Sequence, residues 1–333
     1  MSILAYLSAI GKCVIYGATP FFTGALSDSG IDVLDLLSLR FLLSFVVFFI
    51  LKTVRVIKID FKIKDIFVKN PKTPFIKNLL FAALFEPVLY MLFETLGISM
   101  TNGVTTAVIL SAAPVFYCVG EFIFFRKYPS FWQGVFLTLG MVGAAYIAVC
   151  TSTEGGSSSF MGIVFLVLSL TVGALFCVFS RKSSEHFSPL AITFVSSMLG
   201  AVCFNSVNIV RHLIKGDILH YFDPYFDPQN LLGFAVLGIG STIFATIMSN
   251  YALSKIRIST FSAFGGVSTI VTVLIGVIFA DEKLMYFHYI GFPLILARMI
   301  GVCVIDIVKD RKKMKAETLA EPNKKNKFQR KRR

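Results

Sequence analysis

Long apolar runs separated by short polar segments dominate the chain. A helix needs about 20 apolar residues to cross the hydrocarbon core of a membrane. Runs of this length are continuous here, without the alternation that is typical of the strands of a membrane β-barrel. The pattern predicts an all-α integral membrane protein with ten transmembrane helices, at residues 3–26, 33–51, 75–97, 102–125, 130–150, 160–180, 189–210, 230–252, 258–280 and 286–308.

The composition supports this class. Apolar residues make up 56% of the chain and charged residues 15%, whereas soluble domains contain about 45–50% and about 25%. These values exclude a large soluble enzyme and a disordered chain. The net charge of +13 is concentrated in a few segments, without the aromatic or groove-reading context of a nucleic-acid-binding protein. We therefore expect no nucleic-acid partner.

Basic residues fall almost entirely on one side of the predicted helices. Of the 32 lysines and arginines, 26 lie in residues 52–77, 126–127, 181–182, 255–257 and 309–333. The loops of the other side contain only Arg211, Lys215 and Lys283. Because cytoplasmic loops are rich in Lys and Arg, both termini are predicted to be cytoplasmic. The protein itself is predicted to lie in the inner (cytoplasmic) membrane of the cell. The N-terminal run lacks a preceding basic stretch, which indicates a retained first helix.

The two halves of the chain resemble each other at an offset of about 156 residues. VLDLLSLRFLLSF parallels SPLAITFVSSMLG, which places Arg40 over Ser196, and Gly17 parallels Gly173. Each half contains five predicted helices, an odd number, so the second half is inverted relative to the first. Residues 1–150 and 151–308 are thus predicted as two inverted five-helix repeats, followed by a basic tail at 309–333. Inverted repeats are typical of transporters with a substrate site near the membrane midplane.

Three stretches also indicate a family. They are L-x-x-L-R-F ending at Phe41, YMLFETLGISMTNGVTTAVILSAAPVF at 90–116, and IGVIFADEKL at 275–284. On these residues the chain resembles the drug/metabolite transporter superfamily, in particular the bacterial EamA type. The resemblance implies ten helices and export or exchange of small metabolites across the inner membrane. The first half departs from the family pattern at residues 126–128, where the second half keeps an acidic motif at 281–284, so the resemblance assigns no substrate.

Ionisable side chains inside the hydrocarbon cost about 2.5–3.5 kcal/mol each on insertion scales, so each requires an explanation. Glu121 and Asp306 lie close to the cytoplasmic ends of their helices, and we expect them to extend to the interface. Lys12 is deeper. Its long side chain leaves two interpretations open, one at the interface and one in a buried polar site.

Glu86 lies near the middle of the third predicted helix and precedes Pro87. Proline removes a backbone hydrogen bond and predicts a kink at this point. Tyr90 and Glu94 follow Glu86 at helical spacing and share one face with it. This polar stripe either lines a cavity or forms a hydrogen-bonded structural cluster.

Two arginines in the spans have alternative partners. Arg298 lies at midplane depth in the tenth helix and either pairs with Glu86 or faces water in a cavity. Arg40 either pairs with Glu94 or extends outward to the interface.

The eighth helix is the counterpart of the third and presents Thr242, Thr246, Ser249 and Asn250 on one face. The two polar stripes are predicted to meet across the axis that relates the repeats. From both stripes and the midplane arginine we select six candidate substrate-binding residues: Glu86, Tyr90, Glu94, Thr246, Asn250 and Arg298.

These observations predict a secondary transporter that works by alternating access, and the resemblance implies that it exports small metabolites. The anionic and cationic groups at depth would fit amino acids, or an organic cation held by Glu86 with aromatic walls. The chain has no G-x-x-x-x-G-K-[ST] nucleotide-binding motif, so energy would come from a proton gradient or from substrate exchange. Glu86 and Glu94 are the candidate proton carriers. An integral membrane enzyme and an uncoupled channel are the alternatives.

Other partners are few. The six cysteines and four histidines form no ligand spacing, so we expect no metal, cofactor or catalytic residues. The tail ends in NKKNKFQRKRR, which predicts a disordered basic segment that is attracted to anionic membrane lipid. A homodimer is left open.

Overall fold

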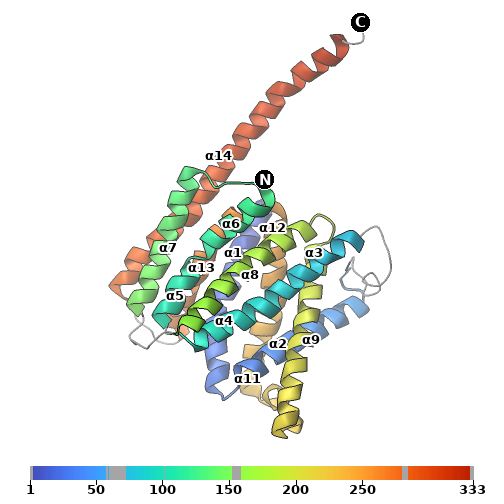
Figure 1. Ribbon diagram of the computed structural model, residues 1–333, viewed down its shortest axis with the longest axis vertical. Helices are drawn as coiled ribbons and strands as arrows, with labels where there is room; N and C mark the ends of the chain where they lie inside the picture. Colours follow the sequence, from blue (N-terminus) through green and yellow to red (C-terminus); the bar gives the residue numbers. More distant parts are fainter. Residues whose placement is uncertain are drawn as a thin grey trace.

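The computed structural model of the protein describes residues 3–57, 59, 73–101, 103–151, 159–279 and 284–330 (Figure 1). All elements in these residues are helical, as the sequence predicts. The first half contains α1 (Ile3–Asp28), α2 (Val33–Thr53), α3 (Thr73–Ala83), η2 (Leu84–Leu89), α4 (Tyr90–Ser99), α5 (Gly103–Ser111), α6 (Ala113–Phe125) and α7 (Phe131–Thr151). The second half contains α8 (Phe160–Ser183), α9 (Pro189–Lys215), η3 (Ile218–His220), α10 (Asp223–Phe226), α11 (Pro228–Phe234), η4 (Ala235–Ala245), α12 (Thr246–Lys255), α13 (Ile258–Phe279) and α14 (Tyr286–Arg330).

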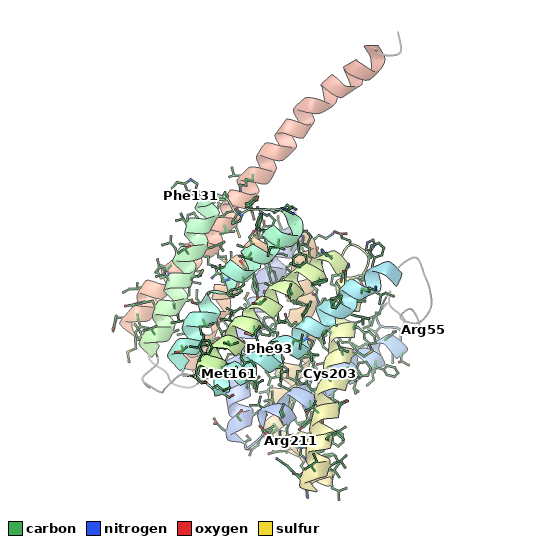
Figure 2. The ribbon with its side chains drawn as sticks, viewed as in Figure 1. Arg55, Phe93, Phe131, Met161, Cys203 and Arg211 are labelled. Atoms are coloured by element: carbon green, nitrogen blue, oxygen red, sulfur yellow. The ribbon has the colours of Figure 1, made fainter. Side chains whose placement is uncertain are left out.

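Nine helical segments of the described chain are long and apolar enough to cross a membrane, and α5 with α6 forms a tenth crossing. The helices expose large apolar side chains such as those of Phe131 and Met161 (Figure 2), as expected for a surface in contact with lipid. Five crossings separate the start of α1 from the start of α8, so the two repeats have opposite orientations. The predicted fold class is confirmed.

Both termini lie on one side of the bundle (Figure 1). We call this side the termini face and the opposite side the far face. Helices α7 and α14 pack along each other at one edge, and α1 packs against α13. Helix α14 continues past the bundle at the termini face (Figure 1).

Local sequence explains where several helices begin and end. Ser188 caps α9 by accepting a hydrogen bond from the Ala191 N–H at 3.3 Å, and Pro189 follows at the first helical position. Gly216 ends α9 with a φ of 77°, a conformation that glycine adopts without steric cost. These signals fix the ends of a helix that carries a large share of the core.

Two expectations need correction, and two segments singled out in the sequence lie partly outside the described residues. The predicted span 102–125 is two helices, because α5 ends at Ser111 and α6 begins at Ala113, with Pro114 in its first turn. The predicted disordered tail is helical up to Arg330, since residues 309–321 are mostly strong helix formers. Residues 58 and 60–72 of the basic segment 52–77, and residues 281–283 of the acidic motif, lie outside the described residues.

Candidate functional site

A cavity of about 860 Å³ lies in the middle of the bundle and is lined by residues of both repeats. This volume lies within the range of small-molecule sites, about 300–1,000 Å³. Five charged side chains line it, together with tyrosines, phenylalanines and small hydroxyl residues. The charged residues are Lys12, Arg40, Glu86, Glu94 and Arg298.

The cavity extends towards the far face. Its lining includes Thr23 near the end of α1, Val33 at the start of α2 and Ile98 near the end of α4, and all three positions lie at the far-face ends of their helices. Towards the termini face, the lining residues Lys12, Ser249 and Phe261 are buried, whereas Val33 and Ile98 at the far face are exposed. The cavity is therefore open to the far face and closed to the termini face.

Irregular backbone borders the cavity in both repeats. At Glu86 the chain leaves helical geometry (φ −133°, ψ 121°), which divides the third crossing into α3 and α4. The kink predicted from Pro87 is confirmed. The eighth crossing contains the π-helical segment η4 at the corresponding place, and the offset of 156 residues aligns Glu86 with Thr242. Irregular helices at matching positions of inverted repeats are typical of transporter substrate sites.

The polar stripe of the third crossing is held by an internal hydrogen bond. The Tyr90 hydroxyl donates to Glu94 Oε1 at 2.8 Å, one helical turn away. Glu86, Tyr90 and Glu94 all line the cavity. Glu86 lies within electrostatic range of Lys12, Glu94 and Arg40, but no ion pair within 4 Å joins it to a described residue.

Two hydrogen bonds between side chains join the first repeat to the irregular eighth crossing. Arg40 Nε donates to Thr242 Oγ1 at 3.3 Å, and the Tyr16 and Thr246 hydroxyls lie 3.3 Å apart. Arg40 is 6% exposed, so its predicted extension to the interface is wrong. It also forms no direct ion pair with Glu94. Its guanidinium instead contributes a charge to the cavity wall.

Arg298 reaches the cavity from α14. Its Nη2 donates to the Ser262 carbonyl on α13, and its buried Nε has no hydrogen-bond partner among the described residues. The proposed Glu86–Arg298 ion pair is not formed, and the position of Arg298 agrees with the alternative in which it faces the cavity. The side chain can take this path because Gly140 of α7 leaves room for it. A Cβ atom at Gly140 would lie 2.8 Å from Arg298 Cγ and closer still to Arg298 Cβ and Cδ.

Substituting Gly140 tests this packing. We expect Gly140→Ala to displace Arg298, to cost about 1–3 kcal/mol of stability through overpacking, and to reduce transport. Gly134 on the same helix has open space around it, so Gly134→Ala is the matched control and should leave both properties nearly unchanged. Thermal unfolding of the two purified variants and their transport rates in proteoliposomes check this. Equal effects of both substitutions would contradict it.

Five of the six candidate residues line the cavity; Asn250 does not. Asn250 is fully buried, accepts a hydrogen bond from Ser180 at 2.7 Å and donates one to Thr193 at 3.0 Å. These contacts tie α12 to α8 and α9. In this structure the side chain therefore holds helices together, at the edge of the polar face that Thr246 and Ser249 share.

Two buried carboxylates occupy the closed side of the cavity. Glu121 on α6 is 1% exposed and accepts hydrogen bonds from Arg257 Nε at 3.3 Å and the Ser259 N–H at 3.1 Å. Asp306 on α14 accepts from Thr260 and from Gln133. The expectation that Glu121 and Asp306 extend to the interface is wrong, because both carboxylates are buried and hydrogen-bonded inside the bundle.

These contacts join the two repeats at the termini face. Glu121 and Gln133 belong to the first repeat, whereas their partners Arg257 and Asp306 belong to the second. Because both carboxylates act across the boundary between the repeats, they hold the repeats together on the side where the cavity is closed.

Sequence reasoning did not select Lys12, Arg40, Tyr16 and Thr242, which also line the cavity. For Lys12 and Arg40, the position of a charged residue inside an apolar run was the feature of the sequence that could have indicated a cavity. Nothing in the sequence separated a residue facing a cavity from one reaching the interface, because both choices keep the charge out of lipid.

Ten membrane crossings in two inverted repeats, with irregular helices around a charged midplane cavity, define a transporter architecture. The EamA-like transporter family matches the chain twice, at residues 3–149 and 160–305. The chain therefore belongs to this family, is a multi-pass membrane transporter, and confirms the resemblance noted from its motifs.

Relatives agree with this assignment. The "Uncharacterized transporter YcxC" of Bacillus subtilis (strain 168) is 28% identical over 297 residues, which are 89% of this chain and 92% of the relative. An "Uncharacterized transporter" of Archaeoglobus fulgidus is 25% identical over 67% of this chain and 74% of its own length. A solved structure described as "Crystal structure of protein" aligns with 90% of this chain and 98% of its own, with a TM-score of 0.67 and 12% identity. That likeness shows the fold.

Proposed function

We propose that the protein is a secondary transporter that exports small metabolites, such as amino acids, across the cytoplasmic membrane by alternating access. The observation that carries this proposal is the midplane cavity, where the irregular segments of both repeats meet. Glu86 of η2 and Thr242 of η4 lie at aligned positions and both line it. A site shared between repeats becomes accessible from either side when the repeats move relative to each other.

The orientation in this proposal follows from the basic segments. Lys and Arg are concentrated in the segments on the side of the termini, which assigns the termini face to the cytoplasm. The far face is then outside, and the structure has its cavity open outward. Rocking of residues 1–150 against residues 151–308 would break the contacts of Glu121 and Asp306 and open the cavity inward. Export is supported by the resemblance to bacterial EamA-type transporters.

Counterflow in proteoliposomes tests the transport mechanism. Purified protein is reconstituted, the vesicles are loaded with unlabelled amino acids, and uptake of a labelled amino acid is measured. A carrier gives faster labelled uptake when unlabelled substrate is present on the trans side. Uptake that is indifferent to trans substrate would indicate a channel. Chemical conversion of the solute without net movement would indicate a membrane enzyme.

Coupling to protons is assigned to Glu86 or Glu94, the two carboxyl groups that line the cavity. A carboxyl group that lines an alternating cavity can take up a proton on one side and release it on the other. We expect an imposed pH gradient to accelerate net transport by the wild type, and Glu86→Gln or Glu94→Gln to lose this acceleration while it keeps counterflow, because glutamine cannot carry the proton. If the wild type transports at the same rate with and without the gradient, proton coupling is overturned and substrate exchange remains as the mechanism.

A further inference from the structure

Two cations at the closed end of the cavity have no carboxylate partner. Lys12 is 8% exposed and Arg298 is 4% exposed, and both line the cavity. Among the described residues, Lys12 forms no hydrogen bond and no ion pair, and Arg298 donates one hydrogen bond, to a backbone carbonyl. A buried cation without an anion is costly inside a membrane. Both side chains therefore present a positive charge to the cavity without a direct anionic partner among the described residues.

The two cations converge on the same segment of α13. Lys12 Nζ lies 3.5 Å from the centre of the Phe261 ring, and Arg298 Nη2 donates to the carbonyl of the next residue, Ser262. Both cations also lie within electrostatic range of Cys13. They therefore approach one region of the cavity, Lys12 from α1 and Arg298 from α14.

Neither carboxylate of the cavity forms a direct ion pair with these two cations. Glu94 accepts a hydrogen bond from Tyr90 at 2.8 Å. It lies one helical turn beyond Tyr90, on the side of the far face. Glu86 interacts with Lys12 electrostatically, but no nitrogen–oxygen distance between Glu86 and either cation is within 4 Å. With every group ionised, the lining holds three positive and two negative charges. A solute that carries an acid group would balance the excess.

We propose that Lys12 and Arg298 form an anion subsite that binds the carboxylate of the transported solute. This inference rests on the proposed transport function and names the chemical class of its substrates. A guanidinium presents a planar fork that matches a carboxylate, and an ammonium adds a compact point charge. Simple organic acids and amino acids share the required group. An amine of the same size without an acid group lacks it.

Three probes that share the leucine side chain separate these groups. L-leucine carries both an amine and a carboxylate, 4-methylpentanoate only the carboxylate, and 3-methylbutylamine only the amine. Each is added to the purified protein at matched ionic strength, and the unfolding temperature is measured, because a ligand of the folded state raises it. Other amino acids and C2–C10 mono- and dicarboxylates, each with its matched amine, extend the panel.

We expect one or more carboxylate probes, and none of the amines, to stabilise the wild type. Lys12→Gln and Arg298→Gln should each weaken carboxylate binding at least about 30-fold, the factor that corresponds to about 2 kcal/mol for an unpaired buried charge contact. Arg298→Lys should retain part of the response because it keeps the charge. Lys215→Gln, at an exposed position at the end of α9, is the control and should bind as the wild type does.

The outcomes distinguish this inference from the proposed function. Stabilisation by amines as strong as by acids, or full carboxylate binding by Arg298→Gln, would overturn the anion subsite and leave a transporter of another substrate class. Absence of stabilisation by every carboxylate would overturn it too, and counterflow of a neutral or cationic solute would then still support transport. Absence of counterflow with every solute would remove the proposed function itself.

Discussion

Replacing Arg298 by leucine is expected to abolish transport while the protein stays folded and at least as stable as the wild type. The guanidinium is buried at midplane depth with one hydrogen bond, to the Ser262 carbonyl. Its burial costs about 2.5–3.5 kcal/mol on insertion scales, whereas a single hydrogen bond from a charged group returns about 1.5–3 kcal/mol. Leucine removes both contributions and leaves the carboxylate of the solute without its cationic partner.

Transport in proteoliposomes and thermal unfolding of the same preparation measure the two effects. Arg298→Lys is the matched control and should restore part of the transport, because it returns a positive charge to the cavity. A fall of the unfolding temperature by several degrees in Arg298→Leu, in parallel with the loss of transport, would mean that the residue is structural. Unchanged transport would remove it from the site.

Glu121→Gln is expected to open the termini face. The carboxylate accepts hydrogen bonds from Arg257 and from the Ser259 backbone across the boundary between the repeats. A hydrogen bond to a charged group contributes about 1.5–3 kcal/mol, and the partial exposure of Arg257 favours the lower end of this range. Such a loss shifts the ratio of outward-open to inward-open molecules by roughly tenfold. The substitution should leave the cavity itself unchanged.

Thiol labelling reports this shift. In a chain whose six cysteines are replaced, Ser268→Cys places one thiol in the cavity lining of α13, near midplane. With Glu121→Gln, a membrane-impermeant reagent applied at the termini face should label it faster than in the parent. Glu185→Gln makes the same chemical change at an exposed position near the end of α8 and should have no effect. Equal labelling rates in both variants would show that Glu121 does not hold this face closed.

Much of the fold could be predicted because membrane insertion constrains the sequence so strongly. Apolar runs of spanning length have few alternatives to a transmembrane helix, and Pro87 marked its kink because proline cannot donate a backbone hydrogen bond. Tyr90 and Glu94 were placed together by helical spacing alone, and their hydrogen bond follows from it. These features depend on neighbours along the chain.

Features that depend on packing between distant helices could not be predicted. Glu121 and Asp306 occur near helix ends, where a sequence does not distinguish a residue at the interface from one in the interior. Both carboxylates are held in the interior by hydrogen-bond donors from α7, from α13 and from the turn before α13. Asn250 shares its helix face with Thr246, but α8 and α9 pack over it. Segment η4 contains no proline that would have indicated its π-helical turns.

Sided labelling of Ser268→Cys during transport tests the central claim, that one cavity is exposed to one face at a time. The impermeant reagent is applied at the termini face, without solute and then with a substrate identified by counterflow. We predict slow labelling without substrate and labelling that rises with turnover when substrate is present, while labelling from the far face is fast at rest. Equal labelling from both faces, with or without substrate, would show a continuous channel and contradict alternating access.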